Sequence, residues 1–253
     1  MSTHLIFGDA HAHPDFSNKR ADWLGQLICD VKPDVVIDIG DTADMPSLST
    51  YDKGKRSFVG RSFDKDVQAH NEFQDRIWSR VRKQKQKLPR RIRLIGNHEQ
   101  RIDRCLDLHP ELQGTVGYDK LDLDRYYDTV VYYNGQTPGT IEVDGIAYSH
   151  YFSSGVMGRP IGGEHLAFSL VSKKFQSCTQ GHTHVYDHCV RTTERGRKLY
   201  GLISGCFQDY EADWAGEVNK LWWRGCFIKR NVEDGMYDLE TVSLKSLKQD
   251  YDR

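Results

Sequence analysis

Five short clusters in this chain carry the Asp, Asn and His side chains that bind divalent metal ions in proteins. They are Asp9-Ala10-His11, Gly40-Asp41, Gly96-Asn97-His98-Glu99, His150 and Gly181-His182-Thr183-His184. Each cluster follows an apolar run, where a buried strand would deliver its side chains to one edge of a sheet. Together the clusters supply enough nitrogen and oxygen ligands for two adjacent metal ions.

The types of ligand indicate both the metal and the chemistry. A mixture of carboxylate, amide and imidazole suits Mn, Fe, Zn, Co or Ni, whereas Mg and Ca prefer an all-oxygen shell. Asp9 and His11 lie two residues apart at a predicted strand end, so they point the same way. Asp41 can bridge two ions, and two ions about 3.5–4 Å apart can hold a bridging hydroxide for in-line attack on a phosphoryl group. The clusters therefore predict a two-metal phosphoester hydrolase.

One histidine is placed for proton transfer. His98 stands next to a predicted ligand in a loop that opens a helix, where it can donate a proton to the leaving oxygen. An acidic side chain must orient such a histidine, and Asp44 is the best candidate. His13 repeats the two-residue step after His11 and can contact substrate or lie on a surface loop.

No single cluster is specific. An Asp-x-His triplet occurs by chance in many proteins of this size, and Gly-Asp at a strand end is only slightly more informative. Gly-His-x-His is moderately specific. Taken alone, each cluster favours a structural role, but five of them in one chain, each ending a strand pattern, favour a metal site.

The ordered motifs Asp-x-His, Gly-Asp-x-x-Asp, Gly-Asn-His-Glu, His and Gly-His-x-His resemble those of the calcineurin-like metallophosphoesterase superfamily. The resemblance implies two divalent ions, with Mn ahead of Fe, Zn, Ni or Co. It implies that the first ion is held by Asp9, His11, Asp41 and His184, and the second by Asp41, Asn97, His150 and His182. It also implies that His98 is the proton donor, supported by Asp44. The stretch 205–225 is similar to members from bacteriophages and bacteria.

Two departures from the protein Ser/Thr phosphatases of that superfamily narrow the function. Those enzymes follow the second motif with Arg-Gly, whose arginine binds phosphate, whereas here Asp44 is followed by Met45-Pro46. They also carry His-Gly-Gly at the fourth motif, where this chain has His150-Tyr151-Phe152. We therefore expect a phosphodiester or nucleotide-type substrate. A phosphomonoesterase, including a protein phosphatase, is the alternative, because Arg101 or Arg159 could replace the missing arginine.

Two further hypotheses belong to other classes. A catalytically silent scaffold would keep the fold and bind partners, but a drifting site should lose ligands first, and here the ligand set is intact. A nucleic-acid enzyme could use the nine Lys and Arg residues between Arg76 and Arg93, a stretch without Asp or Glu and with Trp78 interleaved. Much of this stretch is the outer side of a predicted helix, which favours a solvated face.

Three features beside the motifs complete the predicted site. Glu99 stands where the superfamily's double-strand-break repair nucleases have Asp, and we expect it to support the ligands or the following helix, not to bind metal. Tyr151 and the Gly-rich stretch 155–163 follow a ligand and are predicted to form a wall of the substrate pocket. His13 and Arg101 are the other predicted substrate contacts.

The elements between the motifs predict an α/β fold. Strands are expected at 5–9, 35–39, 92–95, 130–133, 140–143, 146–149, 177–180, 187–191, 198–204, 221–229 and 237–242, and helices over 21–31, 64–87 and 164–174. Strands alternating with helices in the first half indicate a parallel sheet with right-handed crossovers. We expect two mixed sheets packed face to face and flanked by helices, an αββα sandwich. It should form a single domain over 1–253 whose last residues are loose.

Whole-chain properties add few constraints. The net charge is −1 and the sequence pI about 6.8, so the overall balance indicates no class of partner. The chain begins without a signal-like segment and has no apolar run of about 20 residues, so we expect a cytoplasmic protein without membrane contact. Six scattered cysteines without Cys-x-x-Cys spacing indicate reduced thiols. Nothing in the sequence indicates an oligomeric state.

Overall fold

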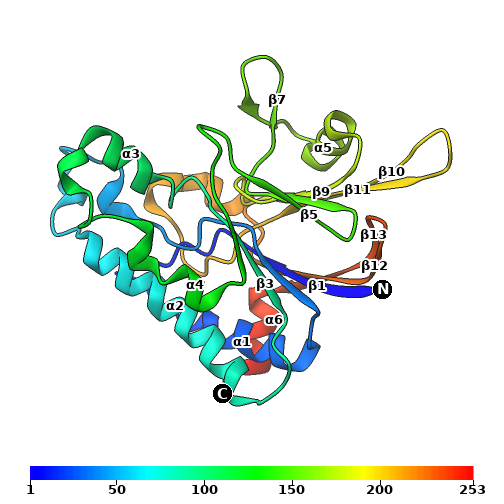
Figure 1. The fold of residues 1–253 in the computed structure, drawn as a ribbon, viewed down its shortest axis with the longest axis horizontal. Coiled ribbons are helices and arrows are strands. Elements are labelled where there is room, and N and C mark those ends of the chain that lie inside the picture. The colour runs from blue at the N-terminus through cyan, green and yellow to red at the C-terminus, as the bar shows by residue number, and fades with distance from the viewer. Residues whose placement is uncertain (253) are drawn as a thin grey trace.

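The computed structural model describes residues 1–252, in which two β-sheets pack face to face with helices on both outer sides (Figure 1). The first sheet has six strands in the order β13-β12-β1-β2-β3-β4, and β1 to β4 run parallel. The second has five in the order β10-β11-β9-β6-β5, and β6, β9 and β11 run parallel. Antiparallel neighbours complete both sheets, so both are mixed. The predicted fold class is confirmed.

The first half of the chain alternates strands and helices, and the second half is mainly extended. The elements up to β4 are β1 (Ser2–Phe7), α1 (Arg20–Val31), β2 (Val35–Asp38), α2 (Phe63–Lys83), β3 (Arg90–Leu94), α3 (Arg101–Leu108), α4 (Leu123–Tyr126) and β4 (Thr129–Val131). The others are β5 (Thr140–Val143), β6 (Ile146–Ser149), β7 (Ser153–Ser154), β8 (Arg159–Pro160), α5 (Leu166–Lys174), β9 (Ser177–Gln180), β10 (Tyr186–Thr192), β11 (Lys198–Ser204), β12 (Gly225–Glu233), β13 (Met236–Ser243) and α6 (Leu244–Tyr251). Among residues 1–252, no helix combines the length and apolarity needed to cross a bilayer.

The two faces of the first sheet pack against different partners. Leu5 and Phe7 of β1 join the apolar cluster that contains α1 and α2, whereas Ile6 between them packs with residues of the second sheet. Trp78 of α2 is fully buried in the first cluster. On the outer side of the second sheet, Leu170 of α5 is buried in a third cluster. The sheets are therefore covered on both faces, and their strand ends remain free to carry a site.

The helix expected over 64–87 ends at Lys83 and the strand expected over 5–9 ends at Phe7, and two further segments differ more from the sequence prediction. The strand expected over 221–229 is β12, which begins only at Gly225 because residues 213–221 form a short 3₁₀ helix. Of the last ten or so residues, which were predicted to be loose, Leu244–Tyr251 form α6 instead, and residue 253 lies outside the described residues. Leu244 and Leu247 lie on one face of this helix and are buried in the core, which holds it against the first sheet.

Candidate metal centre

The polar clusters come together where strands of both sheets end. The turns after β1 and β2 lie side by side, since the Asp9 N–H donates to the Gly40 carbonyl oxygen at 2.8 Å. In the second sheet, the His150 carbonyl oxygen after β6 accepts the Gly181 N–H after β9 at 3.0 Å. Parallel strands end at the same edge of a sheet, so each sheet presents its polar turns there. The centre is built between these two edges.

Three predicted ligands form a first group. His11 Nε2 lies 3.1 Å from His184 Nε2, and His184 Nε2 lies 3.3 Å from Asp9 Oδ1. All three side chains are buried. The His182 N–H donates to the Asp9 carboxylate at 3.0 Å and so holds it in place. The ligand atoms of this group lie within 4.8 Å of one another, which is close enough to share one cation.

The other four predicted ligands form a second group beside the first. His150 Nε2 lies 3.0 Å from Asn97 Oδ1 and 3.3 Å from Asp41 Oδ2. His182 belongs to the same group, with its ligand atom within 4.8 Å of those of Asp41 and His150. Asp41 is also grouped with His11, a member of the first set. The two groups are therefore continuous, and all seven predicted ligands lie in one centre.

Hydrogen bonds direct the imidazole lone pairs into this centre. The Nδ1 of His11 lies 2.9 Å from Asp44 Oδ1, and the Nδ1 of His150 lies 3.1 Å from the Ile39 carbonyl oxygen. With Nδ1 engaged in this way, the imidazoles of His11 and His150 turn Nε2 toward the centre, where His184 Nε2 and the Asp41 carboxylate also lie. Neutral imidazole nitrogens and carboxylate oxygens at this spacing fit divalent metal ions.

The electrostatics of the centre also favour a cation. Burial raises the pKa of Asp41, but the neighbouring His150 and His98 hold that pKa well below its usual value, so the carboxylate is ionised. Burial would depress the pKa of His150, yet the Asp41 carboxylate raises it to about 9. Burial and His150 together lower the pKa of His182 to about 4, which leaves its imidazole neutral. Asp41 thus attracts positive charge, which His150 carries as a proton while His182 stays neutral, and a bound cation would take the place of that proton.

Backbone strain is concentrated at these ligands. Asp9, His11, Asp41, His182 and His184 all have positive φ, between 46° and 70°. Non-glycine residues adopt this region rarely, and its cost is tolerated mainly at functional sites. Two glycines in the motifs are needed for close approach, because a side chain at Gly96 would overlap the Asp41 carboxylate and one at Gly181 the Asp9 carboxylate.

Glu99 was expected to support the ligands and not to bind metal, and its carboxylate forms hydrogen bonds with the turns that carry Asp41 and Asn97. Its carboxylate is fully buried and accepts the N–H groups of Asp41, Ala43 and Gly96 at 3.0, 2.8 and 2.9 Å. It also pairs with the buried guanidinium of Arg93. One carboxylate therefore ties the turn after β2 to the turn after β3.

His98 and Asp44 lie together, and Arg101 completes this part of the site. His98 Nδ1 is 2.7 Å from the Asp44 carbonyl oxygen and 3.1 Å from Asp44 Oδ1. Arg101 Nη1 donates to the Asp44 carbonyl oxygen at 2.9 Å, and Nη2 lies 3.1 Å from His98 Nε2. Because arginine only donates, Nε2 is the acceptor in this contact. Burial lowers the pKa of His98, but the Asp41 carboxylate raises it above its ordinary value.

An open cavity of about 830 Å³ adjoins the centre, and His11, Asn97 and His98 line its inner end. Two of the predicted substrate contacts, His13 and Arg101, also line it. The loop between β2 and α2 forms one wall, and the segment 208–214 forms another. The sequence analysis missed the aromatic residues of this cavity, namely Phe16, Tyr51, Tyr210 and Trp214. Phe16 follows the Asp9-x-His11 motif closely in the sequence, whereas Tyr51, Tyr210 and Trp214 belong to none of the motifs.

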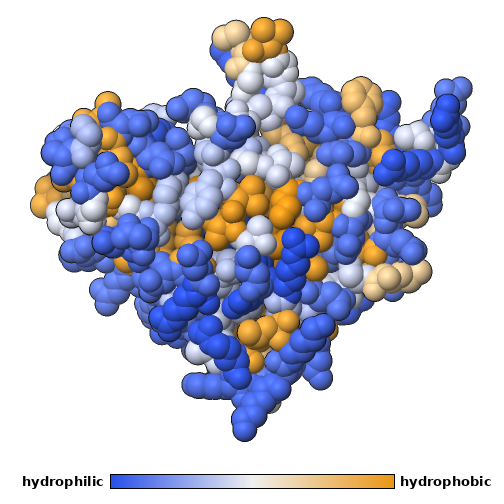
Figure 2. Space-filling model, viewed as in Figure 1, coloured by the Kyte–Doolittle hydropathy of each residue, from blue (hydrophilic) through white to orange (hydrophobic). Residues whose placement is uncertain are grey.

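Tyr151, Arg159 and the stretch 155–163 do not line this cavity. The ring of Tyr151 packs on that of His182, with centroids 4.8 Å apart. The stretch 155–163, which was expected to form a pocket wall, belongs instead to the β7–β8 hairpin, which projects from the second sheet. The exposed tip of this hairpin is apolar, with Val156 and Met157 (Figure 2). Arg159 is exposed on this hairpin and does not reach the cavity.

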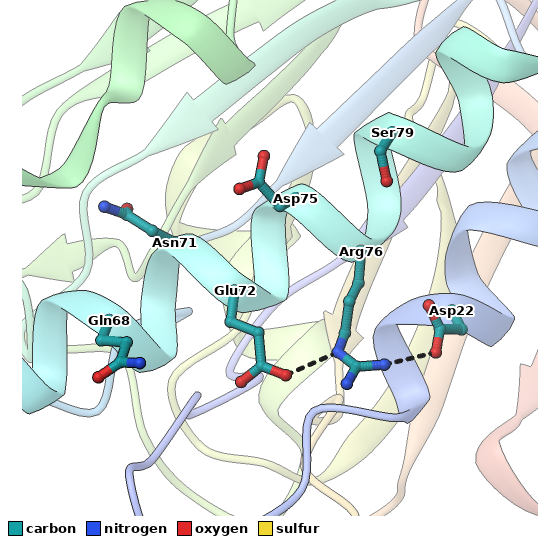
Figure 3. Close-up of a pocket in the computed structure, with 7 residues that line it drawn as sticks. All are labelled: Asp22, Gln68, Asn71, Glu72, Asp75, Arg76 and Ser79. Atoms are coloured by element: carbon teal, nitrogen blue, oxygen red, sulfur yellow. Dashed lines mark hydrogen bonds and ion pairs between the residues drawn. The ribbon is translucent and has the colours of Figure 1, made fainter.

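The basic stretch 76–93 lies away from the cavity. Arg76 is engaged by Glu72 and Asp22 on a shallow polar surface of α2 (Figure 3), and Arg93 is buried. Lys65 at the start of α2 lines the cavity, whereas the stretch begins three turns later and continues to the far end of a helix about 30 Å long. None of its residues lines the cavity, which agrees with a solvated face.

Three solved structures align with almost the whole chain. A predicted phosphoesterase from Streptococcus pneumoniae TIGR4 is 12% identical, with 96% of this chain and 90% of that chain covered and a TM-score of 0.37. The E. coli phosphoesterase Yfce is 11% identical, with 96% and 99% covered and a TM-score of 0.36. The Pseudomonas putida nuclease MPE is 11% identical, with 94% and 87% covered and a TM-score of 0.40. No family model and no curated protein matches the chain.

Identities and TM-scores this low do not establish a shared activity.

Proposed function

We propose that this chain is a calcineurin-like metallophosphoesterase that uses two divalent ions to hydrolyse a phosphodiester or nucleotide-type substrate. One observation carries the proposal. His11 Nε2 and His184 Nε2 face each other at 3.1 Å beside the Asp9 carboxylate, in a group that Asp41 connects to a second one. Buried imidazole nitrogens and carboxylate oxygens that converge in this way fit cations shared among them.

In this proposal Asp9, His11, Asp41 and His184 hold the first ion, and Asp41, Asn97, His150 and His182 hold the second. When bound, the ions would polarise the phosphoryl oxygens and make a water molecule nucleophilic near neutral pH. Asp44 and the Ile39 carbonyl oxygen orient His11 and His150 so that each presents Nε2. Manganese is the first metal to test, before Fe, Zn, Ni or Co.

His98 donates the proton to the leaving oxygen in this mechanism, and Asp44 keeps its ring in place. The Nδ1–H is held by Asp44, so Nε2 is the atom that must carry the transferred proton. Arg101 now occupies that position with Nη2. We expect Arg101 to turn toward the substrate phosphate, which frees His98 Nε2 to take up a proton under the influence of Asp41.

The test compares hydrolysis of bis(p-nitrophenyl) phosphate and p-nitrophenyl phosphate with manganese present. Asp41→Asn and His98→Ala should each lower kcat by about 100-fold or more, since general acid catalysis alone contributes about 10²–10⁴-fold. Matched controls are Asp107→Asn and His109→Ala, two exposed side chains outside the centre. Metal analysis of the replete protein should find two ions per chain.

The outcomes separate the hypotheses. If neither site variant changed the rate of hydrolysis, the activity would come from a contaminant. The hypothesis of a catalytically silent binding scaffold would then be favoured. A large preference for the monoester would make the protein a phosphomonoesterase. Replete protein without a pair of ions would overturn the two-metal assignment.

A further inference from the structure

A stacked pair of aromatic rings forms part of the cavity beside the metal centre. The rings of Phe16 and Tyr210 are 3.8 Å apart between centroids and nearly parallel, at 6°. Both residues line the cavity, and Phe16 is 41% exposed. Tyr51 and Trp214, which are 79% and 75% exposed, line the same cavity, and exposed apolar groups gathered in one place mark a ligand-binding surface.

Hydrogen bonds fix Tyr210, and one of them connects it directly to a residue of the centre. The Tyr210 hydroxyl donates to the His11 carbonyl oxygen at 2.7 Å, and the Tyr210 carbonyl oxygen accepts from Arg224 at 2.8 Å. The Arg20 guanidinium lies 5.9 Å from the Tyr210 ring. Tyr210 is thus packed between neighbours, and Phe16 is the outer ring that can receive another planar group.

Charge decides the kind of planar group. The acidic residues that line the cavity are Asp15, Asp44, Asp52, Asp66, Glu211 and Asp213, and the basic ones are Lys55, Arg61, Lys65 and Arg101. Two of the basic residues, Lys55 and Arg61, are already paired with Asp52. A single-stranded polynucleotide needs a positively charged groove along its backbone, and this cavity lacks one. A neutral aromatic group attached to one phosphate has no such requirement.

We propose that the cavity binds the nucleoside part of a small nucleotide ester, with the base stacked on Phe16. This inference rests on the proposed function, because the phosphate of the same molecule would lie at the metal centre. The volume of about 830 Å³ is in the range of pockets for small molecules. Trp214, which is 75% exposed in the same wall, offers a second aromatic surface at the mouth.

The test measures binding without hydrolysis, by calorimetry or ligand-observed NMR on the metal-free protein. The probes are thymidine, 2-deoxyribose and the oligonucleotide dT8. Thymidine should bind measurably and deoxyribose should not. Phe16→Ala should weaken thymidine binding about 5- to 150-fold, because stacking on an aromatic side chain is worth about 1–3 kcal/mol per base. Phe16→Trp should retain binding.

Phe168→Ala is the matched control, since this phenylalanine is also half-exposed but does not line the cavity. The inference would be overturned if thymidine and deoxyribose bound with the same affinity. It would also be overturned if the Phe16→Ala and Phe168→Ala variants bound thymidine equally well. Binding of dT8 that is far tighter than that of thymidine and falls steeply with salt would replace the nucleoside with a polynucleotide. Because no metal is present, loss of the proposed hydrolysis would leave these outcomes unchanged.

Discussion

Two buried polar clusters on opposite faces of the first sheet are organised in different ways. The site-side cluster lies between the sheet and α2 and contains Arg93, Asp38, Glu99, Thr42 and Tyr127. The inter-sheet cluster lies between the two sheets and contains Lys229, His4, Tyr148 and Thr179. In both, one basic side chain is fully buried.

The site-side cluster is compensated in charge. Arg93 pairs with both Asp38 and Glu99, and these two carboxylates raise its pKa although burial alone would lower it. Glu99 then uses its remaining capacity to accept three backbone N–H groups of the ligand turns. Asp38 also accepts from the hydroxyls of Thr42 and Tyr127. Through Glu99, this cluster is therefore connected to the turns that carry the candidate ligands.

The inter-sheet cluster has no such compensation. Lys229 donates to the hydroxyls of Thr179 and Tyr148, and its ammonium lies over the rings of Tyr148 and Tyr237. It pairs with no carboxylate in residues 1–252, and burial lowers its pKa well below the usual value. A buried charge is costly unless it is paired, so this cluster is polar packing whose amine tends to be neutral. Of the two buried basic side chains, Arg93 therefore stays charged beside two carboxylates near the candidate ligands, and Lys229 tends to lose its charge.

The largest effect is expected from Glu99→Gln, which leaves Arg93 with a single carboxylate. Breaking a buried pair in this way should lower the free energy of unfolding by about 3–5 kcal/mol. Loosening the ligand turns should lower metal-dependent hydrolysis about 10- to 100-fold. Urea unfolding and the hydrolysis assay measure the two effects. Glu240→Gln is the control, because its ion pair with Arg230 is exposed and worth less than about 1 kcal/mol.

If Glu99→Gln matched Glu240→Gln in both measurements, the site-side cluster would not be supporting the centre. The comparison between the two clusters would then lose its basis.

A smaller effect is expected from acid, through His4 in the inter-sheet cluster. Burial lowers the pKa of His4 from 6.5 to about 4, partly offset by Asp144 and reinforced by Lys229. The unfolded chain therefore binds a proton at higher pH than the folded one, so the free energy of unfolding falls as the pH drops from about 6.5 to about 4. The total loss from this group is about 3 kcal/mol.

Chemical unfolding at several pH values measures this dependence. In His4→Gln, the difference in bound protons between the unfolded and folded chain should fall by about one in that pH range, so the free energy of unfolding should depend less on pH. Equal slopes for the parent protein and His4→Gln would show that His4 is protonated in the folded state.

The smallest effect is expected from Lys229→Met, which removes the uncompensated amine and keeps an unbranched side chain. The free energy of unfolding should stay the same or rise by up to about 2 kcal/mol, since a buried amine without an acidic partner is replaced by apolar volume. Hydrolysis should not change, because no side chain of the inter-sheet cluster belongs to the metal centre. Thermal unfolding and the hydrolysis assay check both points. A loss of activity would mean that this cluster is coupled to the centre.

Much of the site could be predicted because its residues follow strand ends. The apolar runs before Asp9, Asp41 and Asn97 indicate buried strands, and parallel strands bring their ends to one edge. The fold class followed from the same pattern. The late start of β12 was not predictable in this way, since Leu221 and Trp222 extend its apolar run but belong to the preceding turn.

The aromatic residues of the cavity wall could not be predicted from the sequence either, because their neighbours lie in distant segments of the chain. Phe16 and Tyr210 are far apart in sequence and meet only because the turn after β1 and the segment after β11 lie together. The basic stretch 76–93 was conspicuous in sequence, yet the direction of α2 carries it away from the cavity. Residue type shows what a side chain can do, but it does not show what lies beside it.

The sequence by itself determined the ligand types, their order and the strand ends that carry them, because hydrophobic periodicity and motif spacing are local properties. Only the tertiary structure decided that Glu99 ties two turns together, that Arg93 is buried with two acids and Lys229 with none, and that Phe16 faces a cavity. Those contacts join segments of different strands and helices. Their energies depend on burial and on neighbouring charge, which arise only when the sheets have packed.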